Sequence, residues 1–152
     1  MPRRWSIARV SGALLAVALV GCLHGNNAPS GRAELRVRSS PEGFLVSWPM
    51  GEVVEVQVGR CAAACQETEP FDPTSEFSEE IPAPEFADLA WHVTIPTGAA
   101  APLRLGVSPP SATVLVPFTE PTLDDGAWAV FVVLETPRGD TVLVQTGVAR
   151  LN

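Results

Sequence analysis

The chain has 152 residues, with 17 acidic and 10 basic side chains and a formal net charge of −7. Its hydrophobic content of 46% is too high for a disordered chain, and its length is too short for two ordinary domains. The excess of acid argues against nucleic acid as a partner, because a phosphate backbone binds a basic patch.

Residues 1–21 have the pattern of a signal peptide. Three arginines among the first nine residues are followed by an apolar stretch over residues 12–20. At about 1.5 Å per residue, this stretch is too short to cross about 30 Å of hydrocarbon as a helix. It fits the apolar core of a secretory signal, so we expect the segment to direct export.

The apolar stretch ends in Leu19-Val20-Gly21-Cys22, which resembles the lipobox of bacterial lipoproteins. The resemblance implies a thioether-linked diacylglycerol on Cys22, cleavage after Gly21 and often acylation of the new amino terminus. Two or three acyl chains, at about 0.8 kcal/mol per buried methylene, form a stable membrane anchor. The alternative is an ordinary cleaved signal with an incidental cysteine.

Residues 22–32 follow as the lipidated Cys22 and a polar stretch rich in Gly, Asn, Pro and Ser, which predicts a flexible tether. Leu23, rather than Asp, follows the lipidated residue. By resemblance to lipoproteins of enteric-type bacteria, this favours the outer membrane, with the protein facing the periplasm or the cell surface. We therefore expect a lipid-anchored protein of the cell envelope.

From residue 33 onward, apolar and polar side chains alternate with a period of two, which is typical of half-buried strands. The pattern places apolar residues 89, 91, 93 and 95 on one face of a strand. Residues 127–134 are apolar on both faces, as in a central strand covered on both sides. Thr136-Pro137-Arg138-Gly139 predicts a type I turn that closes a hairpin. The runs are residues 35–37, 44–48, 54–58, 89–95, 103–107, 112–118, 127–136 and 141–150.

About eight short strands with frequent turns predict an all-β fold, an antiparallel β-sandwich over residues 33–152. Trp48, at the end of the second run, and the stretch from Leu123 to Trp128 resemble features of immunoglobulin and fibronectin type III domains. In that resemblance, Leu-x-x-Gly-x-aromatic leads into the penultimate strand. The chain has Trp128 where such domains usually have Tyr, and it has no inter-sheet cysteine pair.

Residues 66–88 contain eight acids, four prolines and no basic residue. Proline and mutual charge repulsion disfavour a packed helix or strand, so we expect a long acidic surface loop. Phe71, Phe77 and Phe86 are interleaved with the acids. These rings either anchor the loop on the sandwich or form a partner surface.

The acidic loop could also bind Ca²⁺, because hard cations prefer clustered oxygen ligands. Asp72, Glu76, Glu79 and Glu80 form the nearest cluster, but EF-hand spacing and its turn glycine are missing. A solvated run of charge is the simpler interpretation, and we predict no bound metal. A periplasmic accessory protein that binds a ligand or Ca²⁺ through this loop is the alternative function.

Cys61 and Cys65 form an even pair once Cys22 is set aside, and an exported protein favours oxidation. Three intervening residues allow the Cα separation that a disulfide needs, so we predict a structural disulfide at the base of the acidic loop. The alternatives are a redox-active pair, which more often has two intervening residues, and metal ligation together with His92.

A catalytic set is not evident in the sequence. His92 lies on the polar face of its run, where a solvated or cross-strand role is the default, and no Gly-x-Ser-x-Gly motif is present. We predict a non-enzymatic interaction or structural module without a cofactor. Its expected contacts are the membrane, through the lipid on Cys22, and an envelope protein.

Overall fold

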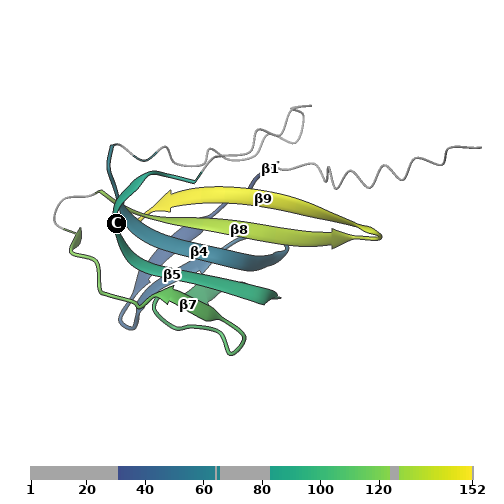
Figure 1. Ribbon diagram of the computed structural model, residues 1–152, viewed down its shortest axis with the longest axis horizontal. Helices are drawn as coiled ribbons and strands as arrows, with labels where there is room; N and C mark the ends of the chain where they lie inside the picture. Colours follow the sequence, from purple (N-terminus) through teal and green to yellow (C-terminus); the bar gives the residue numbers. More distant parts are fainter. Residues whose placement is uncertain (1–30, 64, 66–82, 124–126, 152) are drawn as a thin grey trace, which may run out of the picture.

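The computed structural model describes residues 31–63, 65, 83–123 and 127–151, and the described residues form β-strands without a helix (Figure 1). The predicted all-β, antiparallel sandwich is confirmed. The strands are β1 (Gly31–Arg32), β2 (Arg36–Ser40), β3 (Gly43–Ser47), β4 (Glu52–Cys61), β5 (Phe86–Ala99), β6 (Leu103–Arg104), β7 (Thr113–Val116), β8 (Trp128–Arg138) and β9 (Thr141–Arg150).

Two sheets form the layers of the sandwich. The large sheet has the order β1-β9-β8-β4-β5-β7, and the small sheet has the order β2-β3-β6. Every pairing is antiparallel except that of β1 with β9, which is parallel. The arrangement of two antiparallel sheets with the N-terminal strands shared between them is consistent with an immunoglobulin-like fold.

β1 and β2 belong to one short segment that changes sheets. Gly31 and Arg32 pair with β9 of the large sheet, and the amide of Ala33 donates to the carbonyl of Thr146 at 2.9 Å. Three residues further on, Arg36 pairs with Ser47 of the small sheet. The predicted tether was therefore too long at its end, because its last two residues, Gly31 and Arg32, pair within the fold as β1. The segment from β1 to β2 contacts both layers.

The core lies between the two sheets and consists mainly of β-branched and aromatic side chains, whose shape suits packing on a pleated surface. Burying each such side chain contributes about 1.5–3 kcal/mol. The fully buried members include Val46, Val53, Val56, Val58, Trp91, Val93, Ile95, Val130, Val132 and Leu134. Trp48, which follows β3 directly, is 7% exposed and joins this core, as its place in the second run suggests.

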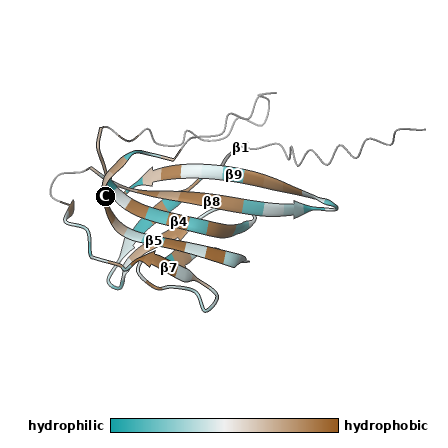
Figure 2. Ribbon diagram, in the orientation of Figure 1, coloured by the Kyte–Doolittle hydropathy of each residue, from teal (hydrophilic) through white to brown (hydrophobic). Residues whose placement is uncertain are grey.

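β8 confirms the prediction of a strand that is covered on both faces. Val130, Val132 and Leu134 point into the sandwich, whereas Ala129 and Phe131 belong to a second buried cluster. Figure 2 shows β8 as largely hydrophobic along its length, between β9 and β4. Continuous apolar sequence in this strand therefore reflects two buried surfaces.

The alternation pattern was wrong at one end of β5. Leu89 is 38% exposed, whereas Ala90 is 3% exposed and lies in the core. The register with β4 shifts between Val58 and Gly59, and this bulge inserts one residue into β5. Side chains alternate between the two faces of a strand, so one extra residue moves the side chains before it to the opposite face. Leu89 is therefore exposed, whereas Trp91 points into the core.

The final hairpin is present, but its turn lies later than the sequence predicted. Arg138 pairs with Thr141, so the connecting residues are Gly139 and Asp140, and Pro137 lies within β8. Gly139 has φ +59°, which a residue without a Cβ adopts at little cost. A two-residue loop with glycine first matches the twist of the flanking strands better than a type I turn does.

The predicted run 103–107 also ends early. β6 contains only Leu103 and Arg104, and the amide of Val107 donates to the carbonyl of Arg104 at 3.2 Å, which turns the chain. Leu105 is still buried, but Val107 is 55% exposed. The turn removes Val107 from the face that Leu103 and Leu105 share.

Candidate functional site

The residues predicted to carry function lie partly outside the described part of the chain. Cys22, Phe71 and Phe77 fall outside the described residues, as do the four acids considered for Ca²⁺. Cys61, Cys65, Phe86 and His92 are described and can be placed.

The predicted disulfide between Cys61 and Cys65 is present, with Cα atoms 5.7 Å apart. Cys61 is the last residue of β4, and its amide donates to the carbonyl of Ala127 at 2.9 Å. Both cysteines are half-buried and pack against the second cluster, whose buried members are Ala129, Phe131 and Val148. The disulfide therefore covers part of the outer face of the large sheet and also closes a short loop.

Phe86 lies in a strand, not in the acidic loop where the sequence placed it. β5 begins at this residue, which pairs with Cys61, and Asp88 pairs with Arg60. The Nε atom of Arg60 donates to a carboxylate oxygen of Asp88 at 3.0 Å. The cross-strand cation compensates the acid, so the loop prediction was wrong for residues 86–88.

The ring of Phe86 packs over Gly59 on the outer face. A Cβ built on Gly59 would lie 2.5 Å from Cγ of Phe86 and 2.8 Å from the carbonyl oxygen of Asp88. Phe86 also packs against Ala129, Phe131 and Val148, with which Val133 completes the cluster. Of the two roles considered for this ring, the contacts are those of an anchor.

A polar cluster lies beside this apolar cluster, on the outer faces of β4 and β5. Gln57 pairs directly with His92 across the two strands. Nε2 of Gln57 donates to Oε1 of Glu55 at 2.7 Å, and Nε2 of His92 lies 2.9 Å from the same oxygen. The side chains of His92 and Glu55 are 19% and 31% exposed. Because His92 lies in β5 and Glu55 in β4, His92 has one of the two predicted roles, that of a cross-strand histidine.

The polar cluster offers binding groups more readily than catalytic ones. Glu55 holds one ring nitrogen of His92, and Gln57 binds the same carboxylate oxygen. A histidine–carboxylate pair activates a nucleophile only when a hydroxyl or thiol lies within hydrogen-bond reach. Among the described residues, no group of three or more His, Cys, Asp or Glu side chains is arranged to hold a metal ion.

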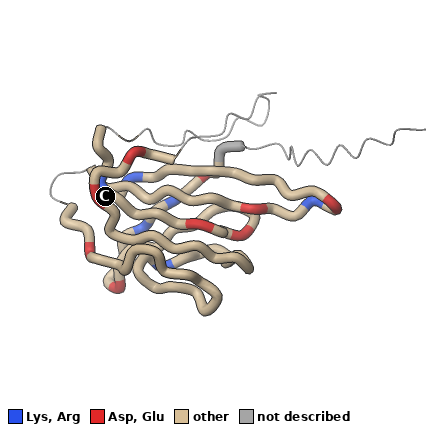
Figure 3. The backbone as a smooth tube through the Cα atoms, in the orientation of Figure 1, with Lys and Arg blue, Asp and Glu red and all other residues tan. Residues whose placement is uncertain are grey.

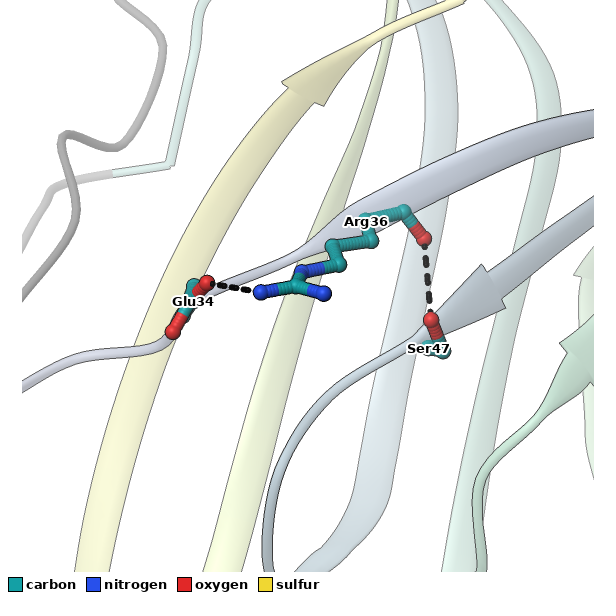
Figure 4. Close-up of polar contacts among 3 residues, drawn as sticks. All are labelled: Glu34, Arg36 and Ser47. Carbon is teal, nitrogen blue, oxygen red and sulfur yellow. Dashed lines mark hydrogen bonds and ion pairs between the residues drawn. The ribbon is translucent and has the colours of Figure 1, made fainter.

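A small hollow lies where the N-terminal segment enters the small sheet. It has a volume of about 260 Å³ and is lined by Glu34, Arg36, Ser47, Trp48 and Pro49. Figure 4 shows Arg36 directed toward Glu34, with an Nη2–Oε1 distance of 2.9 Å. Ser47 donates from its hydroxyl to the Arg36 carbonyl at 3.4 Å. The hollow is smaller than the typical ligand pocket of about 300–1,000 Å³, and the ion pair already neutralises its cation.

Residues 105–119, which we call the neutral rim, were not predicted as a candidate site. The rim has no charged side chain, and Figure 3 shows the chain around β7 without acidic or basic residues. It contains exposed Val107, Val114, Leu115 and Phe118. Its lack of charge was not a specific signal, because residues 89–103 also contain no Asp, Glu, Lys or Arg and include buried Trp91 and Val93.

A scan against known protein families and searches of curated proteins and of solved structures find no match to this chain. Within the described ranges, no helix has the length and hydropathy needed to cross a bilayer.

Proposed function

We propose that this protein is a lipid-anchored, non-enzymatic module of the cell envelope that makes contacts through its β-sandwich. The observation that carries the proposal is Leu19-Val20-Gly21-Cys22 at the end of a nine-residue apolar stretch that follows three arginines. This combination of positive, apolar and small-residue segments is that of an export signal, and the cysteine supplies the thiol for a lipid.

The layout of the chain supports this proposal. Eight residues separate Cys22 from Gly31, the first residue of β1. The sandwich then offers two surfaces suited to contact, the neutral rim and the polar cluster around His92. The disulfide in the sandwich fits an oxidising compartment outside the cytoplasm.

The lipid anchor is tested on protein purified from bacterial membranes with detergent. Mass spectrometry of the N-terminal peptide is expected to show cleavage before Cys22 and a diacylglycerol on its sulfur. The Cys22→Ala variant should remain unlipidated, whereas the matched Cys61→Ser variant should keep the lipid and lose only the disulfide. An unmodified sulfur at Cys22 in the wild-type protein would contradict the proposal.

The contact function is tested by mild solubilisation of the envelope in its native host, followed by affinity capture of the tagged protein. We expect a stoichiometric envelope protein with the wild-type chain, and less of it with Cys22→Ala, which leaves the membrane. Recovery of the protein alone after chemical crosslinking in intact cells would count against an interaction module.

A further inference from the structure

The neutral rim gathers exposed apolar surface at one edge of the large sheet. Seven large hydrophobic side chains are exposed among the described residues, and four of them, Val107, Val114, Leu115 and Phe118, lie in the rim. Figure 2 shows β7 as hydrophobic at this edge. A concentration of exposed apolar side chains in one segment marks a surface for a protein or a membrane.

The rim is poorly suited to strand addition, although β7 is the terminal strand of its sheet. β7 has only four residues and is followed at once by Pro117. Val114 pairs with Val93 and Val116 pairs with His92, so Leu115 is an extra residue in a bulge. Short edge strands, bulges and prolines all prevent an edge from pairing with another chain. We therefore expect a binding partner to contact the side chains of the rim and not to add a strand to β7.

The composition of the rim is compatible with the interfacial layer of a bilayer. The rim combines Val, Leu and Phe with the hydroxyls of Ser108, Ser111 and Thr113. Such a surface places apolar groups at the acyl boundary and hydroxyls among the headgroups.

The absence of charged side chains from the rim also permits contact with lipid. The chain carries net charge −7, and a surface of anionic lipids repels acidic side chains. The rim has no acid or base between Arg104 and Glu120, so it can approach such a surface without desolvating a charge.

The segment between Cys22 and β1 is long enough for the rim to reach the membrane that holds the anchor. The predicted anchor at Cys22 is nine residues from Gly31, a reach of at most about 30 Å. β1 and β7 are opposite ends of the six-stranded sheet, separated by five strand spacings or about 24 Å. A domain that is anchored beside β1 can therefore bring the β7 edge to the same bilayer.

We propose that the neutral rim rests on the lipid surface of the membrane that holds the anchor, with Leu115 and its neighbours in the interfacial layer. This inference rests on the proposed function, because the acyl chains keep the domain within reach of the bilayer. Docking through the rim would fix the orientation of the sandwich on the bilayer.

The test uses the full lipoprotein, reconstituted in vesicles of phosphatidylethanolamine and phosphatidylglycerol. A diazirine-bearing amino acid replaces Leu115 in one preparation and Val142, which is also apolar and exposed, in the matched control. After illumination, we expect lipid adducts at position 115. The yield of lipid adducts at position 142 should be at least several-fold lower. Near-ultraviolet circular dichroism identifies any preparation that fails to fold.

The same sample separates the two proposals. If the N-terminal peptide carries lipid on Cys22 but position 115 crosslinks to water, to a second copy or to another protein, the rim proposal fails alone. If Cys22 carries no lipid, both fail. As a second measure, Leu115→Glu should reduce lipid adducts at a probe placed at Val107, whereas Val142→Glu should leave them unchanged.

Discussion

The rings of Trp91 and Phe118 meet edge to face, with centroids 6.1 Å apart and an interplanar angle of 89°. Trp91 is fully buried in β5, whereas Phe118 is 38% exposed and lies beyond β7. The amide of Thr119 donates to the carbonyl of Ala90 at 2.8 Å, which holds the segment against the sheet. Phe118 thus connects the neutral rim to the core.

Replacing Phe118 with Ala should lower the free energy of unfolding by about 2 kcal/mol. The loss combines the aromatic pair, worth about 0.5–1.5 kcal/mol, with part of the burial of the ring. Urea denaturation followed by tryptophan fluorescence measures it. The control Val142→Ala, at an equally exposed side chain, should change stability by less than about 0.5 kcal/mol. Equal effects of the two variants would show that the ring contact is not stabilising.

Removing the disulfide should cost about 2 kcal/mol, because a loop of five residues closes little chain entropy in the unfolded state. The Cys61→Ser/Cys65→Ser variant and the reduced wild-type protein should therefore unfold at similar urea concentrations. Dithiothreitol should shift the midpoint of the wild-type protein and leave that of the variant unchanged. A wild-type midpoint that does not respond to full reduction would refute a stabilising role.

Gly59→Ala should destabilise the protein by about 1–3 kcal/mol, because the new methyl group would overlap the ring of Phe86 and the carbonyl of Asp88. The effect should shrink in the presence of Phe86→Ala, which removes one of the two obstacles. A double-mutant cycle from urea denaturation measures this coupling. Strict additivity of the two substitutions would mean that the ring does not lie over Gly59.

The contact between Glu55 and His92 should show a favourable coupling of about 0.5–1 kcal/mol in a cycle of alanine substitutions, since both side chains are partly removed from water. Glu34 and Arg36 provide the matched control, because their side chains are 41% and 68% exposed and should couple more weakly. Thermal unfolding of the single and double variants measures both cycles. A stronger coupling at the exposed pair would contradict this ranking.

The sequence predicted the layers of this fold well, because period-two burial is a local property. Val130 and Val132 could be assigned to one face of β8, and the apolar residues between them indicated that the other face is also covered. The disulfide was equally predictable, since Cys61 and Cys65 are close in sequence and the segment before Cys22 predicts export.

The errors arise where distant partners decide the local structure. The bulge beside Gly59 depends on the register between β4 and β5, so the exposure of Leu89 could not be inferred from its own neighbours. Asp88 was grouped with a solvated acidic run because its partner Arg60 is 28 residues away in sequence. The neutral rim escaped notice because exposure depends on which strand ends the sheet, and β7 does so only once the topology is known.

The attachment of β1 has a mechanical consequence. If acyl chains on Cys22 hold the protein to a membrane, a pulling force reaches the domain first at β1. Gly31 and Arg32 pair in parallel with β9, and the amide of Ala33 donates to the carbonyl of Thr146. A load directed along the strands shears these few bonds together, whereas a load across the sheet opens them one at a time. We therefore expect the pairing of β1 and Ala33 with β9 to break under force before the core of the sandwich unfolds.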